Sequence, residues 1–82
     1  MARRKTKHYV INSRYICDWL SYHRFMQKDL ANMTGYSESF ISMMLSQDVF
    51  RATMELTFAI ADAMFVDPRA LVIELDGVGA NE

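Results

Sequence analysis

Apolar residues recur at helical spacing in several segments of the chain, and this pattern predicts a bundle of short helices. In the first such segment, residues 14–24, apolar positions three and four apart share one face of a helix. Asn12 or Ser13 is expected to cap this helix, because each offers a side-chain oxygen to the free N–H groups of the first turn. The residues expected to be buried are Ile16, Trp19, Leu20 and His23, with Phe25 in the following linker.

Two further short helices, over residues 27–33 and 37–45, are predicted to be joined by a tight turn. Gly35 can adopt a left-handed backbone without a Cβ penalty, so the chain can reverse direction there. Ser37 is expected to cap the second of the two helices. The predicted inward residues are Leu30 and Met33 beside the small Ala31, then Ile41 together with Met44 or Leu45.

A fourth helix is predicted over residues 54–65, with Thr53 as its cap. Steps of four and three assign its buried face to Met54, Phe58, Ala61 and Phe65. The pair Asp67-Pro68 then starts a last short helix or turn through Leu71, since proline is tolerated at a first helical position.

Two β-prone stretches lie near the ends of the chain. The sequence HYVI at 8–11 is expected to form a strand or the lead-in to the first helix, and LVIEL at 71–75 an edge strand. The expected fold class is therefore all-α, a compact domain of four to five helices with a short C-terminal edge strand. Residues 76–82 are expected to be a flexible tail.

The charges are divided unevenly along the chain, although the formal net charge is only −1. Residues 1–28 hold seven Lys and Arg against Asp18 alone, and residues 29–82 hold two against nine carboxylates. One basic end that sits near phosphates is therefore expected. A solvated basic tail is the alternative interpretation.

The remaining composition excludes several classes of protein. The single cysteine, Cys17, cannot form an internal disulfide, is expected to be partly buried, and favours a reducing compartment. No apolar run is long enough to span a membrane, so a cytoplasmic protein is expected. The two histidines lack partners for a metal site, and the scattered carboxylates offer no acid–base pair, so neither a cofactor nor an enzyme is expected. Tyr15, Trp19 and Tyr22 are interpreted as aromatics of the core and its edge.

The chain resembles the lambda-repressor and Cro-like (Xre) group of helix-turn-helix proteins. The residues that carry the resemblance are Gln27, Leu30-Ala31, Gly35, Ser37, Ile41-Ser42, Ile60-Ala61, Ala63, Val66 and Pro68. The resemblance implies a helix-turn-helix domain over 12–75, preceded by a basic arm over 1–11. It also implies a bacterial or phage-encoded regulator, such as a Cro protein or minimal repressor, that binds double-stranded operator DNA.

The resemblance assigns roles to particular residues of this chain. The second motif helix would enter the major groove, and its base-reading residues would be Glu38, Ser39, Phe40, Ser42 and Met43. Contacts to phosphates are expected from Arg3, Arg4, Lys5 and Lys7 in the arm, and from Gln27, Lys28, Ser37 and Arg51. A homodimer on two half-sites is expected, with Val72, Ile73 and Leu75 as dimer residues; a weak dimer that forms on DNA is also consistent.

The reading residues differ from the arginine, glutamine and asparagine side chains that give bidentate contacts to bases. Glu38 can accept a hydrogen bond from a cytosine amino group, the two serines can bond to several bases, and Phe40 and Met43 can pack on thymine methyl groups. Such contacts discriminate between bases but add little affinity, so we expect the arm to supply the phosphate contacts. The competing interpretation is a protein-interaction module, such as an antirepressor, a binder of host polymerase or an antitoxin.

Overall fold

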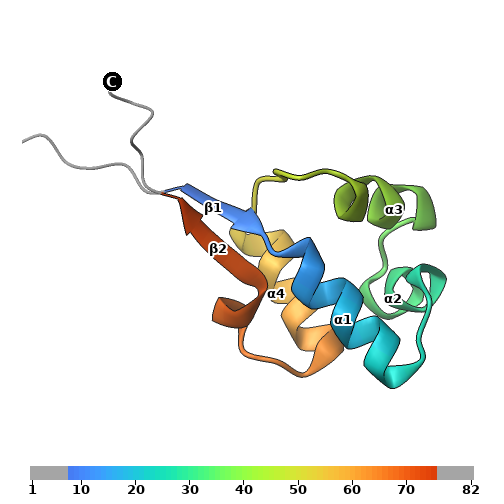
Figure 1. Cartoon of the computed structure of the whole chain (residues 1–82). Helices are drawn as coiled ribbons and strands as arrows, with labels where there is room; N and C mark the ends of the chain where they lie inside the picture. Colours follow the sequence, from blue (N-terminus) through green and yellow to red (C-terminus); the bar gives the residue numbers. More distant parts are fainter. Residues whose placement is uncertain (1–7, 76–82) are drawn as a thin grey trace, which may run out of the picture.

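The computed structural model describes residues 8–75, which form a mostly helical fold with a small two-stranded sheet (Figure 1). The expected four helices and C-terminal strand are all present, and the fold is extended by a strand at residues 8–11. The elements in chain order are β1 (His8–Ile11), α1 (Ser13–His23), α2 (Gln27–Thr34), α3 (Glu38–Ser46), α4 (Met54–Met64), the 3₁₀ helix η1 (Pro68–Leu71) and β2 (Val72–Leu75).

Side-chain oxygens start four of the helical elements. Asn12 accepts the N–H of Tyr15 at 3.1 Å to begin α1, and Thr53 accepts the N–H of Leu56 at 3.2 Å to begin α4. Asp67 likewise accepts the N–H of Arg69 at 2.9 Å at the start of η1. These caps satisfy first-turn N–H groups that have no partner within the helix. The expected cap at Thr53 and the helical start expected at Asp67-Pro68 are confirmed, and Asn12 rather than Ser13 caps α1. Ser37 caps α3 in the same way, as described below.

The two strands are the first and last elements of the described region, and they lie side by side. β1 and β2 pair antiparallel, with Val10 opposite Ile73 and Ile11 opposite Val72. The other edge of β1 is also paired, because Ile11 donates to the carbonyl of Phe50 at 2.8 Å and Ala52 donates to the carbonyl of Tyr9 at 2.9 Å. The described fold therefore starts at His8, and only residues 1–7 of the expected arm lie outside the described residues.

One hydrophobic core is shared by all four α-helices and η1. Its fully buried large side chains are Ile16, Leu30, Ile41, Met44, Ile60, Met64 and Leu71. Ala31 is also buried, and α2 packs against both α3 and α4 around it. Tyr15 and Trp19 are half-buried at the edge of this core, as expected. Among residues 8–75, no helix is long and apolar enough to cross a membrane.

The predicted inner face of α4 was wrong, except at Ala61. Met54, Phe58 and Phe65 are exposed to 74%, 53% and 93%, and the core is filled by a different stripe of the same helix. That stripe consists of Leu56, Thr57, Ile60, Ala61 and Met64. At about 100° per residue the two stripes lie roughly a quarter turn apart and share Ala61. Both stripes are largely apolar and have helical spacing, so periodicity alone does not decide which of them is buried.

Several residues expected in the core lie outside it. His23 and Tyr22 are exposed because α1 ends there, with Arg24 in a left-handed conformation (φ 61°). Phe25 and Met33, each 40% exposed, lie at the rim where α1 and α2 end, rather than inside. Cys17, expected to be partly buried, is also exposed, since it points away from the Ile16 and Leu20 stripe of α1.

The backbone of Phe65 is strained, and its side chain is exposed. It ends α4 in a left-handed conformation (φ 57°) that glycine adopts without penalty. We expect Phe65→Gly to raise the free energy of unfolding by about 1 kcal/mol, measured by urea denaturation.

Phe65→Ala separates the backbone effect from loss of the ring, because alanine keeps the Cβ that causes the strain. This control is expected to leave stability nearly unchanged. A glycine variant no more stable than the alanine variant would contradict the prediction.

Candidate nucleic-acid interface

The α2–turn–α3 unit is held by a short polar turn and by buried apolar residues. Gly35 lies at φ 87° and donates its N–H to the carbonyl of Ala31 at 2.8 Å. The Thr34 hydroxyl donates to the carbonyl of Leu30 at 2.8 Å and accepts the N–H of Tyr36 at 3.3 Å. These bonds satisfy the carbonyls that a helix end leaves free. They set the direction in which α3 leaves the turn.

The outer face of α3 matches the face expected from the sequence. Ile41 and Met44 are fully buried, whereas Glu38, Ser39, Ser42 and Met43 are exposed, Met43 to 43%. Ser37 accepts the N–H of Phe40 at 3.0 Å and so caps the helix. This outer face of α3 therefore presents a carboxylate, two hydroxyls and one thioether to solvent, and no cationic side chain.

Phe40 lies at the border of this face and is half-buried. Its ring centroid is 4.9 Å from that of Tyr36 and 5.8 Å from that of Phe50, which it meets edge-on. These contacts are at the spacing of stabilising aromatic pairs. Phe40 thus anchors α3 to the loop that follows it, and only part of its surface is available to a ligand.

Residues expected to contact phosphates and bases meet at the start of α2. Gln27, Lys28 and Glu38 line one open hollow of about 450 Å³, together with Cys17, Leu20, Ser21, Phe25 and Met26. The Met26 N–H is donated to the Asp29 carboxylate at 2.6 Å. Within residues 8–75, the N–H groups of Gln27 and Lys28 have no hydrogen-bond partner. Free N–H groups at a helix start favour an anion.

The remaining expected phosphate contacts are placed differently. Arg51 is exposed on the loop between α3 and α4, and its backbone bridges to Val10 of β1. The hydroxyl of Ser37 is already engaged in capping α3. Arg3, Arg4, Lys5 and Lys7 lie outside the described residues.

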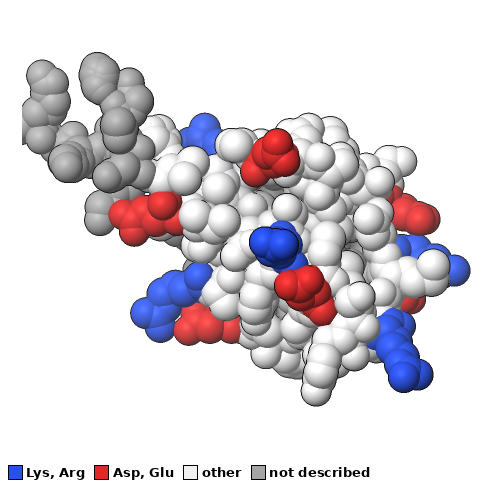
Figure 2. Space-filling model, viewed as in Figure 1, with Lys and Arg blue, Asp and Glu red and all other residues white. Residues whose placement is uncertain are grey.

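The described part of the chain is acidic rather than basic. Residues 8–75 contain five Lys and Arg and eight Asp and Glu, a net charge of −3. On the face drawn in Figure 2, blue and red side chains alternate and form no continuous area of one sign. One close pair is Arg69 and Asp67, 3.1 Å apart and largely exposed. Hydrogen bonds from the side chain and backbone of Arg69 lower the pKa of the Asp67 carboxyl below its usual value.

The expected dimer residues lie on both faces of the two-stranded sheet. Side chains alternate along a strand, so Val72 shares a face with Glu74, and Ile73 shares the opposite face with Leu75. Val72 is half-buried, whereas Ile73 and Leu75 are 43% and 40% exposed. The edge of the C-terminal strand is covered within the chain, because it pairs with the strand formed by HYVI.

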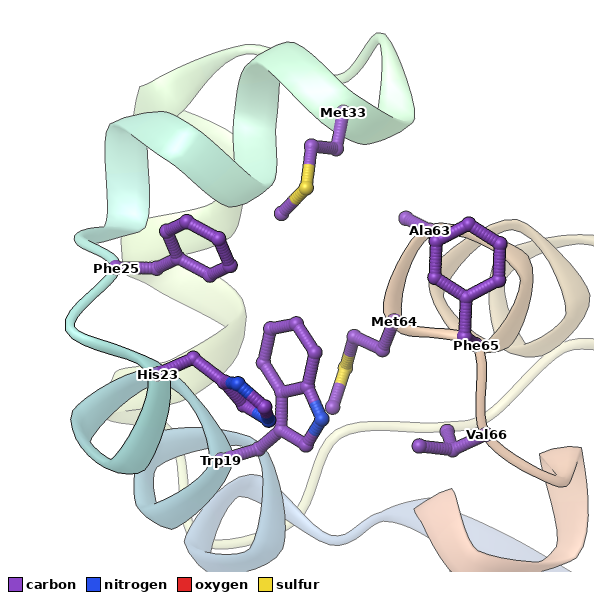
Figure 3. A pocket seen from close by; sticks show the side chains of 8 residues that line it. All are labelled: Trp19, His23, Phe25, Met33, Ala63, Met64, Phe65 and Val66. Carbon is purple, nitrogen blue, oxygen red and sulfur yellow. The ribbon is translucent and has the colours of Figure 1, made fainter.

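A second hollow, of about 480 Å³, opens where α1, α2 and α4 end (Figure 3). Its walls are aromatic, thioether and aliphatic side chains, with His23 as the polar group: Trp19, His23, Phe25, Met33, Ala63, Met64, Phe65 and Val66. Trp19 and His23 lie closest, with ring centroids 4.3 Å apart. The sequence did not predict this hollow, because it arises from helix ends that periodicity places in the core. Within residues 8–75, no cluster of His, Cys, Asp or Glu could hold a metal ion.

Comparison of the chain with protein-family models, with curated proteins and with solved structures found no match.

The cap of α3 provides a test of the site's local structure. Ser37→Ala removes the acceptor for the Phe40 N–H and should lower the free energy of unfolding by about 1 kcal/mol, measured by urea denaturation. Ser39→Ala, on the exposed face of the same helix, is the matched control and should change stability little. Equal effects of the two substitutions would contradict the assigned cap.

Proposed function

We propose that this protein is a sequence-specific double-stranded DNA-binding regulator that represses transcription as a homodimer by occupying promoter DNA. The observation that carries the proposal is the α2–turn–α3 unit, in which a capped nine-residue helix projects an exposed polar and apolar face beyond the core. A helix of this diameter fits the major groove.

In the proposed complex, the start of α2 approaches a phosphate. Gln27 and Lys28 lie at that end, and the free N–H groups of the first turn add a favourable dipole. Glu38 lines the same hollow, and its carboxylate would be repelled by a DNA phosphate. In the proposed complex, this carboxylate therefore points to a base edge and away from the DNA backbone. Cytosine, whose amino group donates in the major groove, suits Glu38 best.

Affinity in this proposal comes mainly from the basic arm. The described residues carry a net charge of −3, so they repel a polyanion as a whole, and α3 has no cation to offset this. The four cations at Arg3, Arg4, Lys5 and Lys7 release counterions when they contact phosphates. The arm and α3 thus have separate roles, in affinity and in base preference.

Removal of residues 1–7 tests the role of the arm. We expect the truncated protein to bind duplex DNA much more weakly, with the slope of log K against log salt reduced by about 3 to 4, because four phosphate contacts are lost. Fluorescence anisotropy across a salt series measures this slope.

Lys28→Ala is the comparison for a single cation of the folded domain. It should reduce the slope by about 1 and weaken binding to all sequences alike. An unchanged slope after deletion of the arm would refute the assignment of affinity to these residues.

Met43 provides a test of base reading. If its thioether packs on a thymine methyl group, replacement of that thymine by uracil should weaken binding by about fourfold, since one buried CH₂ contributes about 0.8 kcal/mol. Met43→Ala should remove the preference for thymine over uracil at one position of a selected site. Met33→Ala, a methionine of nearly equal exposure (40% against 43%) at the end of α2, is the control and should leave the preference intact. A preference unchanged in Met43→Ala would contradict this contact.

The second candidate function is docking of another protein on the same α3 face. The acidic and apolar composition of that face and the net charge of the described residues favour it. Retention on a heparin column or a nonspecific DNA shift at low salt separates the two functions. A DNA binder should be retained, whereas a protein-only binder should pass through.

A further inference from the structure

Three helices end around the hollow shown in Figure 3, and residues at or near these ends line it. Trp19 and His23 come from α1, Met33 from α2, and Ala63 and Met64 from α4. The carbonyl end of a helix carries a partial negative charge, equivalent to about half an elementary charge. Three such ends around one hollow favour a cation inside it.

Basic side chains do little to offset this negative charge. The last turns of α2 and α4 contain no basic residue, and the last turn of α1 contains only His23. Arg24, which follows α1, does not line the hollow. None of the described residues that line it is a Lys or Arg. The charge at the helix ends is therefore available to a cation from outside the chain.

The walls of the hollow suit a cation that carries apolar groups. The rings of Trp19, Phe25 and Phe65 line it, and the faces of such rings attract a positive charge. The thioethers of Met33 and Met64 lie between these rings (Figure 3). A volume of about 480 Å³ is within the range of sites for small organic ligands.

The same walls do not suit a metal ion. Calcium and magnesium ions require oxygen ligands in place of their water. No carboxylate, amide or hydroxyl side chain is present among the described residues that line the hollow. The favoured cation is thus one whose surface is itself largely apolar.

Phe65 supports a role in binding rather than in packing. Its side chain is 93% exposed and its backbone is held at φ 57°, so the residue lowers stability while it buries little apolar surface. Strained residues of this kind are typical of ligand-binding sites, where the strain is retained for function. A ligand in the hollow would cover part of this ring.

We propose that the hollow binds a small organic cation, namely an ammonium ion that carries apolar substituents such as methyl groups. The positive charge lies near the ends of α1, α2 and α4, and the substituents pack on the rings and thioethers. No residue of α3 lines the hollow, and the site does not depend on DNA binding. Each cation–π contact at an exposed ring is weak, so the affinity is expected to be in the millimolar range.

Titration with choline and with its neutral isostere separates attraction of the charge from burial of apolar groups. In the isostere, a tert-butyl group replaces the trimethylammonium group. Trp19 is the only tryptophan of the chain, so its indole N–H resonance in a proton–nitrogen NMR spectrum of the full chain reports on the hollow. The titration is run at constant ionic strength and at about pH 8, where an ordinary histidine is neutral.

Choline should bind at least roughly tenfold more tightly than the isostere, because only choline gains from the rings and from the helix ends. Equal affinity for the two compounds would show an apolar hollow with no preference for charge, and would overturn the inference. The absence of a saturable shift with choline at millimolar concentrations would overturn it as well.

Phe65→Leu tests the aromatic contact, because leucine keeps an apolar side chain at the same strained position. It should weaken choline binding by about two- to fivefold, as expected for one ring, and leave the isostere unaffected. Phe58→Leu is the matched control, since Phe58 is an exposed phenylalanine of α4 that does not line the hollow. Equal losses in the two variants would contradict the assignment of the site.

Met33→Lys places an ammonium group of the chain at the hollow. It should weaken choline binding by roughly tenfold or more, because the tethered group competes at high effective concentration. Met33→Leu is the control and should bind choline as the wild type does. Circular dichroism verifies that the variants fold, and Phe65→Leu remains the test if Met33→Lys does not. Undiminished choline binding by folded Met33→Lys would overturn the inference.

Discussion

The packing of α2 on α3 across the Gly35 turn is the constraint on which the candidate site depends. Leu30 and Ala31 from α2 meet Ile41 and Met44 from α3 in the core, and all four are buried. Because these contacts and the turn bonds fix the orientation of α3, its opposite side must face outward. The exposed face is thus a consequence of core packing, and its polar residues can change without loss of the buried contacts that hold the fold.

If the protein binds DNA as proposed, the folded domain and the basic arm have different parts in recognition. In that proposal, an α3 face of one carboxylate, two serines and one methionine would discriminate between bases through short-range contacts, although its electrostatics oppose approach to DNA. The four cations among residues 1–7 would supply long-range attraction that does not depend on sequence. Such a separation of roles would make binding strongly dependent on salt and leave base preference to weak, local contacts.

The elements of the fold were predictable from local signals, whereas the burial of individual residues was predictable only in part. The cap at Thr53, the helical start at Asp67-Pro68 and the glycine turn mark boundaries through signals within a few residues, and the structure confirms them. The outer face of α3 was also predicted correctly, since only one of its faces is apolar. α4 has two apolar stripes, so only tertiary packing selects between them, and Met54, Phe58 and Phe65 of the other stripe stay exposed. No local signal indicates that α1 ends at His23, and for this reason the exposure of His23 was not predicted.

Chemical-shift mapping by NMR during titration with duplex DNA at low salt would show whether the α2–turn–α3 unit is the surface that binds DNA. We expect the largest backbone shifts at Ser39, Ser42 and Met43 on α3 and at Lys28 on α2, with little change at Phe65. Shifts absent throughout the titration, or centred on residues far from the α2–turn–α3 unit, would contradict it.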